Sequence, residues 1–300
     1  MLTAILGVSG ALIFGSADFL GGLAAKRMSA LLATAIAAAT GLVLLVVLLP
    51  MLGGTWSAGA ILWGALSGVS GAVAISLLYA CLAIGPMSIL SPLTAVVSAI
   101  VPLTVALAGG ETLGGLGYWA IGLALIAVVL VGFVPEKGAV RPSVKGLAMA
   151  VGSGAAIGAF LVLIDLSPTD SGLVPLVLNR AVNAAIMFSA VGVLFLIGRR
   201  RHSRHEAASL ASGGSDDAAR SVLRAGILLA VACGVIDAVA NTLLLLGIRE
   251  GNLSVMSVLT ALYPAGTILL AAIVLRERIA PVQWAGLVLA LTAAGMLALA

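Results

Sequence analysis

The residues best suited to chemistry in this 300-residue chain lie inside long apolar runs. Asp237 and Asn241 are four positions apart, which places both on one face of a helix. Arg180 lies between Asn179 and Asn183 in the sequence N-R-A-V-N. An Asp or Arg at the centre of a membrane costs about 2.5 to 3.5 kcal/mol, so such a residue usually faces a cavity or a partner. We therefore predict that these groups bind a ligand or one another.

An ion pair between Arg180 and Asp237 is sterically feasible. Asp237 is near the midpoint of its run, and Arg180 is roughly 7–8 Å from the midpoint of its own. Alternatively, Arg180 extends to the membrane interface, and Asp237 only packs against a neighbouring helix. Asp18, in G-S-A-D-F, lies about 7 Å to the other side of its run's centre, too far for a direct bridge to Arg180. It is a candidate for a cavity acid, a protonatable carboxylate or an interface residue.

Hydroxyl groups and prolines mark further candidate positions in the apolar runs. The candidate hydroxyl ligands are Tyr79, Thr94, Thr260 and Tyr263. Such hydroxyls usually bond to the backbone or across helices instead. Candidate helix breaks are Pro92 and Pro102 in one run and Pro264 in another, because proline frees a carbonyl one turn earlier. We expect these breaks to line a cavity; the alternative is that they are kinks packed against neighbours.

Residue clusters typical of metal sites or enzymes are missing from the sequence. His202 and His205 lie in a charged segment without the further ligands that a metal needs. Cys81 and Cys233 lie in apolar runs, and we interpret them as small buried hydrophobes. There is no Walker A motif. We therefore expect no catalytic residues, no metal and no cofactor, and we predict that the chain is not an enzyme.

The composition indicates a membrane protein. Hydrophobic residues make up 62% of the chain and charged residues 9%, and the mean hydropathy is +1.26. A soluble domain carries about 25% charged residues, so a soluble enzyme, a nucleic-acid-binding protein and a disordered protein are excluded. Most of the 15 Lys and Arg residues lie between apolar runs, as anchors of a membrane protein do. The expected surroundings are a lipid bilayer, with no nucleic acid.

Ten apolar runs are long enough to cross a bilayer, which requires about 20 helical residues. They are 3–25, 30–50, 58–84, 87–108, 115–134, 145–166, 173–198, 223–248, 252–275 and 280–300. Backbone groups must be satisfied within lipid, and the alternation typical of barrel strands is missing, so these runs are predicted to be helices. Residues 199–222 are basic and contain a Ser/Gly/Asp stretch, which predicts a flexible loop.

The chain contains an internal repeat. Residues 68–95 match residues 234–261 at thirteen of twenty-eight positions, at an offset of 166 and without gaps. Each half then holds five helices, and because five is odd the second half enters the membrane in the opposite direction. The sequence predicts an all-α polytopic membrane protein with ten transmembrane helices in two inverted repeats, 1–136 and 143–300. Such folds place a substrate site near the midplane, between the halves.

This arrangement resembles the EamA-type ten-helix members of the drug/metabolite transporter superfamily. LIFGSADFL at 12–20 resembles the G-S motif of the family's first helix. Ser88–Pro92 and Ser254–Ser257, each leading into L-T-A, resemble its fourth-helix pattern, and Glu111 and Glu277 resemble the Glu that follows helices 4 and 9. The resemblance covers nearly the whole chain. It implies an integral membrane carrier for small metabolites or drugs, usually an exporter.

The resulting hypothesis is a secondary transporter of a small-molecule substrate that works by alternating access around a midplane cavity. Coupling, if present, would come from a proton carried by Asp237 or Asp18. The alternatives are an uncoupled facilitator or channel-like pore, a structural membrane protein without flux, and an intramembrane enzyme. The sequence leaves the substrate, the direction of transport and the oligomeric state open.

The distribution of basic residues predicts an orientation. The odd-numbered loops hold thirteen Lys and Arg residues, and the opposite side holds only Arg249. The positive-inside rule then places the odd-numbered loops in the cytoplasm and both termini outside, in the plasma or inner membrane. The family resemblance implies cytoplasmic termini instead. We follow the charge count.

Overall fold

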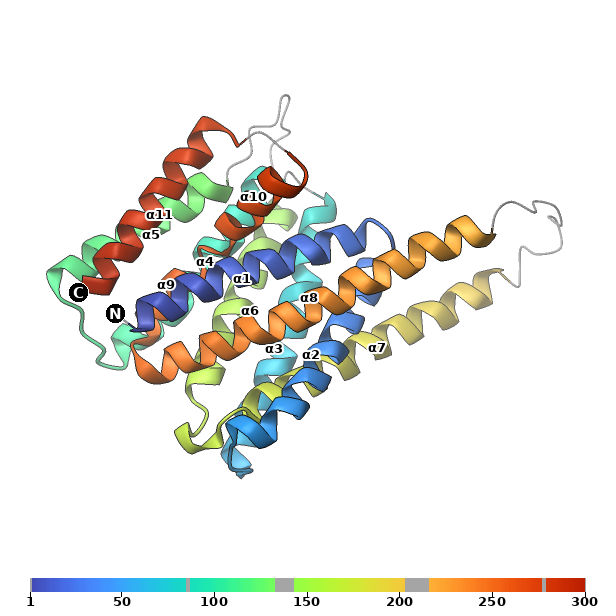
Figure 1. The fold of residues 1–300 in the computed structure, drawn as a ribbon, viewed down its shortest axis with the longest axis horizontal. Coiled ribbons are helices and arrows are strands. Elements are labelled where there is room, and N and C mark those ends of the chain that lie inside the picture. The colour runs from blue at the N-terminus through green and yellow to red at the C-terminus, as the bar shows by residue number, and fades with distance from the viewer. Residues whose placement is uncertain (1, 85–86, 133–142, 203–215, 277–278, 300) are drawn as a thin grey trace.

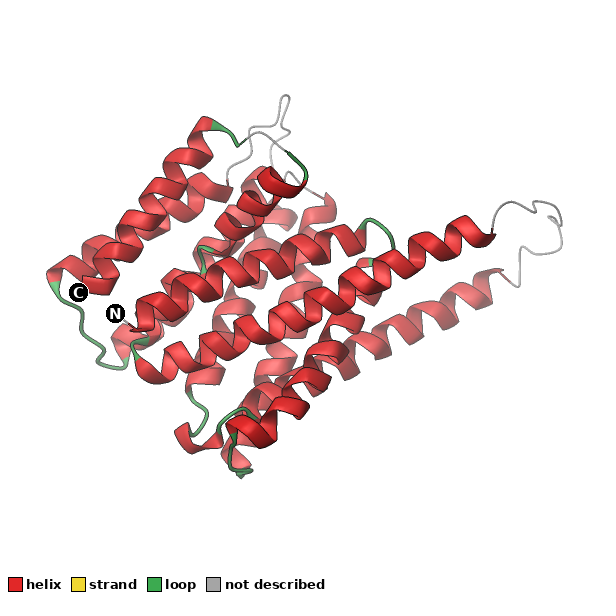
Figure 2. Cartoon of the chain, in the orientation of Figure 1, coloured by secondary structure: helices red, strands yellow, loops and turns green. Residues whose placement is uncertain are grey.

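The structure, a computed structural model, describes residues 2–84, 87–132, 143–202, 216–276 and 279–299. In these ranges the chain is helical, with short connections and no strand (Figure 2). The elements in chain order are α1 (Leu2–Ala25), α2 (Ala30–Leu52), α3 (Ala58–Ile84), α4 (Met87–Ala108), α5 (Gly115–Gly132), α6 (Val144–Asp165), η1 (Thr169–Ser171), α7 (Val174–His202), α8 (Asp216–Glu250), α9 (Leu253–Thr260), α10 (Tyr263–Val274) and α11 (Pro281–Leu299). The predicted all-α fold is confirmed.

The described helices are long enough and apolar enough for a polytopic membrane protein. Nine described segments meet the length and hydropathy expected of a membrane span, and the apolar part of α4, Pro92–Ala108, is shorter. Large apolar side chains are exposed on the outer surface of the bundle, among them Val47 on α2, Phe195 on α7 and Leu228 on α8. The two chain ends lie near each other at one end of the bundle in Figure 1.

The ninth apolar run is not one helix. Residues 252–275 form α9 and α10, with a turn at Ala261 and Leu262 between them. Pro264 explains the break, because it has no N–H to donate to the carbonyl of Thr260 and its ring would collide with that carbonyl. The equivalent position in the first repeat is Ser98, and α4 is continuous there.

The prediction of a flexible loop over residues 199–222 is wrong at both ends. Helix α7 continues to His202 and α8 begins at Asp216, so the described parts of this segment are helical. Alanines and arginines, which are good helix formers, surround the Ser/Gly/Asp stretch and extend both helices beyond the apolar runs. Residues 203–215, including His205, lie outside the described part of the chain.

Helices pack in equivalent pairs in the two halves of the chain. In chain order, α1, α2, α3 and α5 of the first half correspond to α6, α7, α8 and α11 of the second, and α4 corresponds to α9 and α10 together. The contact between α1 and α8 then has its counterpart in the contact between α6 and α3. The contact of α2 with α8 likewise corresponds to that of α7 with α3, and all of these contacts are present (Figure 1). Two related halves would pack in this way. The boundaries at 1–136 and 143–300 stay a prediction.

Two glycines at equivalent repeat positions allow the closest of these approaches. A Cβ atom at Gly68 on α3 would lie 2.6 Å from the backbone oxygen of Asn179 on α7. A Cβ atom at Gly234 on α8 would collide with the backbone oxygen of Ala37 on α2. Small residues permit such close contact between helices in membranes. Both glycines therefore hold α3 and α8 against the helices that carry or face the central polar groups.

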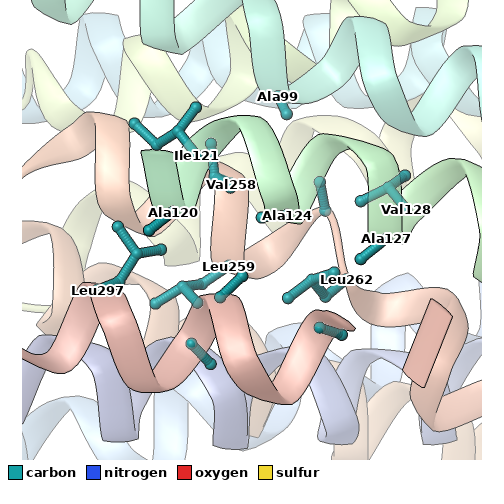
Figure 3. Close-up of a cluster of buried hydrophobic side chains, with 14 of the residues drawn as sticks. Ala99, Ala120, Ile121, Ala124, Ala127, Val128, Val258, Leu259, Leu262 and Leu297 are labelled. Carbon is teal, nitrogen blue, oxygen red and sulfur yellow. The ribbon is translucent and has the colours of Figure 1, made fainter. Parts of the chain in front are cut away.

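The largest buried apolar cluster joins helices from both halves. It is built mostly from alanine, valine and leucine on α1, α4, α5, α9 and α11, with α5 directly against α11 (Figure 3). Ala124 of α5 and Ala293 of α11 are fully buried in it. Tyr263 packs against this cluster, which therefore supports one wall beside the polar residues.

Candidate functional site

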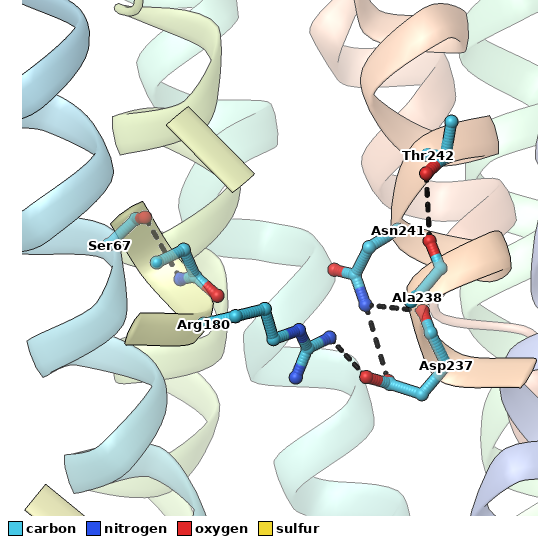
Figure 4. Close-up of polar contacts among 7 residues, drawn as sticks. Ser67, Arg180, Asp237, Ala238, Asn241 and Thr242 are labelled. Carbon is cyan, nitrogen blue, oxygen red and sulfur yellow. Dashed lines mark hydrogen bonds and ion pairs between the residues drawn. The ribbon is translucent and has the colours of Figure 1, made fainter. Parts of the chain in front are cut away.

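The polar centre of the molecule is an ion pair between Arg180 and Asp237. Arg180 extends from α7 toward α8, and its Nη2 contacts the Asp237 carboxylate (Figure 4). The two side chains are 12% and 22% exposed, so both are largely shielded. The pairing that the sequence made feasible is therefore present. Because each charge neutralises the other, the pair reduces the cost of placing both within an apolar bundle.

Asn241 holds the carboxylate in place from one turn along α8. Its Nδ2 donates to the Asp237 Oδ1 at 3.2 Å and to the Asp237 backbone oxygen at 2.8 Å (Figure 4). Asn179, by contrast, is buried between α7 and α3, where its Nδ2 donates to the Ser67 Oγ at 2.9 Å. Asn241 thus belongs to the polar centre, and Asn179 ties two helices together.

Two buried polar atoms beside the ion pair lack a partner among the described residues. They are the Nε of Arg180 and the Oδ1 of Asn183, both on α7. Buried polar groups in proteins are nearly always hydrogen-bonded, so an unpaired donor and an unpaired acceptor one turn apart suggest a place for a ligand. Both residues line the same cavity.

That cavity has a volume of about 480 Å³ and is lined by helices from both halves. Typical small-molecule sites measure about 300 to 1,000 Å³. Its lining residues come from α1, α2, α3 and α5 in the first half and from α7, α8 and α10 in the second. They run from Arg180 and Asp237 to Ala25, the last residue of α1, and so reach the end of the bundle where α1 joins α2.

Three more of the sequence candidates line this cavity: Asp18, Tyr263 and Pro264. Asp18 is exposed although it lies in the interior of the bundle, because the surface it exposes belongs to the cavity. It forms no ion pair or hydrogen bond with the described residues. Tyr263 and Pro264 are at the start of α10, where the break in the ninth run turns the chain toward the cavity.

The remaining candidates lie elsewhere. Thr94 is buried and donates to the backbone oxygens of Leu90 and Ala150, which joins α4 to α6. Pro92 and Pro102 are buried inside a continuous α4, where they pack near Gly132 and Gly158. The described lining of the cavity does not include Thr94, Pro92, Pro102 or Thr260. Tyr79 is on α3, but its side chain lies outside the described part of the structure, as does Glu277.

Small residues of α1 form the part of the lining that the sequence reading missed. Ala17, Gly21 and Ala25 repeat at intervals of four, which is the spacing of one helix face, and Gly22 follows Asp18 at the same interval. This regular spacing of small residues beside an acid was the available signal. Cys233 is only partly buried and lines the cavity, which the interpretation as a buried hydrophobe did not anticipate; Cys81 is buried as expected.

The opposite end of the bundle is closed by contacts between the two halves. Thr55, in the connection between α2 and α3, donates its Oγ1 to a carboxylate oxygen of Asp170 in η1 at 2.6 Å. The Glu111 carboxylate, beyond α4, accepts hydrogen bonds from the backbone N–H and the hydroxyl of Ser254 at the start of α9. Glu111 therefore caps the start of α9 and joins the two halves at this end.

Nothing in the described residues gathers three potential metal ligands of the His, Cys, Asp and Glu types. The polar centre instead combines one ion pair, two amides and one further carboxylate inside an apolar bundle. This arrangement can bind a small polar or charged molecule through hydrogen bonds and charge, and it defines a polytopic membrane protein with an internal binding cavity.

Comparison with known families agrees with this class. The model of the EamA-like transporter family matches residues 144–299, and the chain belongs to that family, which is part of the drug/metabolite transporter superfamily. No curated protein sequence matches the chain. One solved structure, described only as a crystal structure of a protein, is similar in fold with a TM-score of 0.66. It is 14% identical, and the match covers 99% of this chain and 98% of that one.

Proposed function

We propose that this protein is a secondary carrier that exports a small molecule by alternating access between its two halves. Membership of a transporter family supports transport in general. The observation that carries the specific proposal is the position of the cavity: both halves line it, and its described lining residues lie between the polar centre and the end where α1 joins α2. Alternating access requires such a site, which each half can cover or uncover in turn.

The closed end of the bundle explains why a carrier is favoured over a permanently open pore. The Glu111–Ser254 and Thr55–Asp170 contacts join the halves at that end, and the backbones of Gly54 and Gly172 meet there as well. A solute in the cavity would have to wait until these contacts separate. Substrate binding would change the balance between the two states by its unequal affinity for them.

The basic residues give the proposed direction. Lys26 and Arg27 lie directly after α1, at the end that the cavity reaches, and the positive-inside rule places that end in the cytoplasm. The conformation described here would then load from the cytoplasm, which suits export. A reporter fused to the C-terminus and active only in the cytoplasm tests this orientation, because the proposal requires it to be silent.

Cys233 offers a direct test of one-sided access. It lines the cavity, whereas Cys81 is buried. A membrane-impermeant thiol reagent is expected to label Cys233 in inverted membrane vesicles much faster than in intact cells. Cys233→Ser supplies the control, since it removes the cavity thiol and leaves Cys81. Faster labelling from the outside would reverse the proposed orientation.

Transport itself is tested without knowing the substrate. Metabolites in the medium of cells with and without the chain are compared, and the enriched compound is then supplied to proteoliposomes. A carrier shows saturation and counterflow; a channel-like pore shows neither. Proton coupling through Asp237 or Asp18 is a further part of the proposal. If Asp237→Asn protein transported with its full dependence on a pH gradient, Asp237 would not be the coupling residue.

A further inference from the structure

The cavity has an unequal number of positive and negative groups. Among the described residues of its lining, those that carry formal charge are Asp18 and Asp237, with carboxylates, and Arg180, with its guanidinium. Arg180 and Asp237 form an ion pair, and Asp18 has no partner among the described residues. Asp18 also lies close enough to Asp237 for their charges to repel. With its carboxyl groups ionised, the cavity therefore has one uncompensated negative charge, on Asp18.

Arg180 is poorly placed to receive an anionic ligand. Its guanidinium is already paired with Asp237, whose carboxylate Asn241 holds in position. A ligand acceptor can still reach the unpaired Nε of Arg180, but an anion there would place a second negative charge beside Asp237 on a guanidinium whose charge is already neutralised. A neutral acceptor therefore suits the Nε better than an anion, and an anion would meet the repulsion of Asp18 as well.

The described lining around Asp18 is mostly apolar. Ala17 and Gly21 lie beside it on α1, and Ile75, Leu78 and Ile268 contribute aliphatic surface from α3 and α10. Tyr263 lines the same cavity and is close enough to Asp18 for the two to interact electrostatically. An aromatic ring beside a carboxylate is a favourable environment for an organic cation, since the ring face attracts positive charge.

We propose that the ligand of this cavity is an organic cation with an apolar body, bound with its charged group against Asp18 and Tyr263 and its body against the aliphatic wall. The inference rests on the proposed transport function and adds the class of substrate. It assigns different tasks to the two acids: Asp18 neutralises the substrate, and Asp237 neutralises Arg180.

Benzyltrimethylammonium is a suitable probe, because its positive charge is permanent and its body is apolar. Binding is measured by equilibrium dialysis of the radiolabelled compound against the purified full-length protein in detergent. We expect saturable binding to the wild type, and competition by other organic cations but not by benzenesulfonate. Asp18→Asn is expected to weaken binding at least about thirtyfold, as removal of one member of a shielded charge pair does. Asp165→Asn is the matched control and should bind normally, since Asp165 is an exposed acid at the far end of α6.

Two further measurements separate a lost ligand contact from a misfolded variant. Asp18→Glu keeps the charge and should retain most of the affinity that Asp18→Asn loses. In the wild type, benzyltrimethylammonium should slow alkylation of Cys233, which lines the same cavity, whereas its uncharged isostere 2,2-dimethylpropylbenzene should not. Equal protection by both compounds, or equal binding by wild type and Asp18→Asn, overturns the proposal.

Failure of the cation proposal and failure of the transport proposal give different results. Suppose that the protein shows counterflow of a neutral or anionic solute and binds neither benzyltrimethylammonium nor other organic cations. The proposed substrate class is then wrong, and the proposed transport function stands. If no solute shows counterflow and the probe still binds in an Asp18-dependent way, the cation site stands and the carrier function is wrong.

Discussion

Helices α3 and α8 occupy equivalent places in the two copies of the repeat, yet they give the cavity different walls. Both keep a glycine, Gly68 or Gly234, at the closest approach to a neighbouring helix. One turn further on, α3 has Gly71 where α8 has Asp237. The two helices thus have equivalent packing contacts, and of the two only α8 carries the acid at this position. The cavity is therefore asymmetric, and a bound molecule would have its polar contacts on one side.

The largest effect should come from removing the carboxylate of Asp237, which α8 has and α3 lacks. Asp237→Ala leaves Arg180 shielded and without its counter-charge, which should lower the free energy of unfolding by about 3 to 5 kcal/mol. Chemical unfolding in detergent micelles measures this loss, and proteoliposome flux should fall to background. The double variant Asp237→Ala/Arg180→Ala should regain much of the stability but not the flux. Full stability of the single variant would show that the pair is not shielded as described.

The shared glycines should respond alike. Gly68→Leu and Gly234→Leu each introduce a side chain against a helix backbone that cannot move aside, at α7 and α2 respectively. Both should lower the free energy of unfolding by about 1 to 3 kcal/mol, the usual cost of overpacking. Thermal unfolding of the two purified variants in the same detergent provides the comparison. A large loss for only one of them would contradict the equivalence of the two helix contacts.

Replacing Asn241 of α8 by isoleucine, the residue at the equivalent position of α3, should have a smaller effect. Asn241→Ile replaces the amide with the counterpart of Ile75 and removes the hydrogen bonds to Asp237. Because the bond to the carboxylate is long, at 3.2 Å, its loss should cost about 1.5 kcal/mol, the lower end for a bond to a charged group. The free energy of unfolding measured in detergent should fall by this amount, whereas Ile75→Asn, which breaks no hydrogen bond, should lower it by less. A larger loss for Ile75→Asn would show that Asn241 does not hold Asp237 in place.

The smallest effects should distinguish two threonines at equivalent positions. Thr94 donates to two backbone oxygens and joins α4 to α6, so Thr94→Val should cost about 1 kcal/mol of stability. Thr260, at the end of the short α9, forms no side-chain hydrogen bond with the described residues, and Thr260→Val should change stability by less than about 0.5 kcal/mol. Equal losses measured by thermal unfolding would show that the break after α9 does not free Thr260.

The sequence predicted the helices well because their apolar runs are long and are separated by turn residues. The limits of nearly all ten runs fall within a few residues of the described helices. It failed at residues 199–222, where helix propensity continues both helices beyond the apolar part. Of the three predicted helix breaks, the one at Pro264 is present, whereas those at Pro92 and Pro102 are wrong, because α4 is continuous through both prolines. The effect of a proline on the backbone thus depends on its neighbours.

The candidate site could be predicted only in part. Asp18, Arg180 and Asp237 were found because a charge inside an apolar run is costly wherever it lies. The feasibility of the Arg180–Asp237 pair followed from helix rise alone. The sequence could not predict that Asn183 lines the cavity and Asn179 does not, or that Tyr263 does and Thr260 does not. It could not predict that Cys233 lines the cavity either. Each of these positions depends on which face of a helix is turned toward the centre of the bundle.

The amino-acid sequence by itself determined that this protein is a helical membrane protein with a duplicated scaffold and a few charges within it. Hydropathy, the lengths of the apolar runs and the sequence repeat are properties of the chain alone, and they do not depend on how the helices pack. Only the tertiary structure decided which charges neutralise each other, that Asp18 has no partner among the described residues, and that the cavity reaches one end of the bundle. These features depend on distances between side chains from different helices, which are set by packing and not by position along the chain.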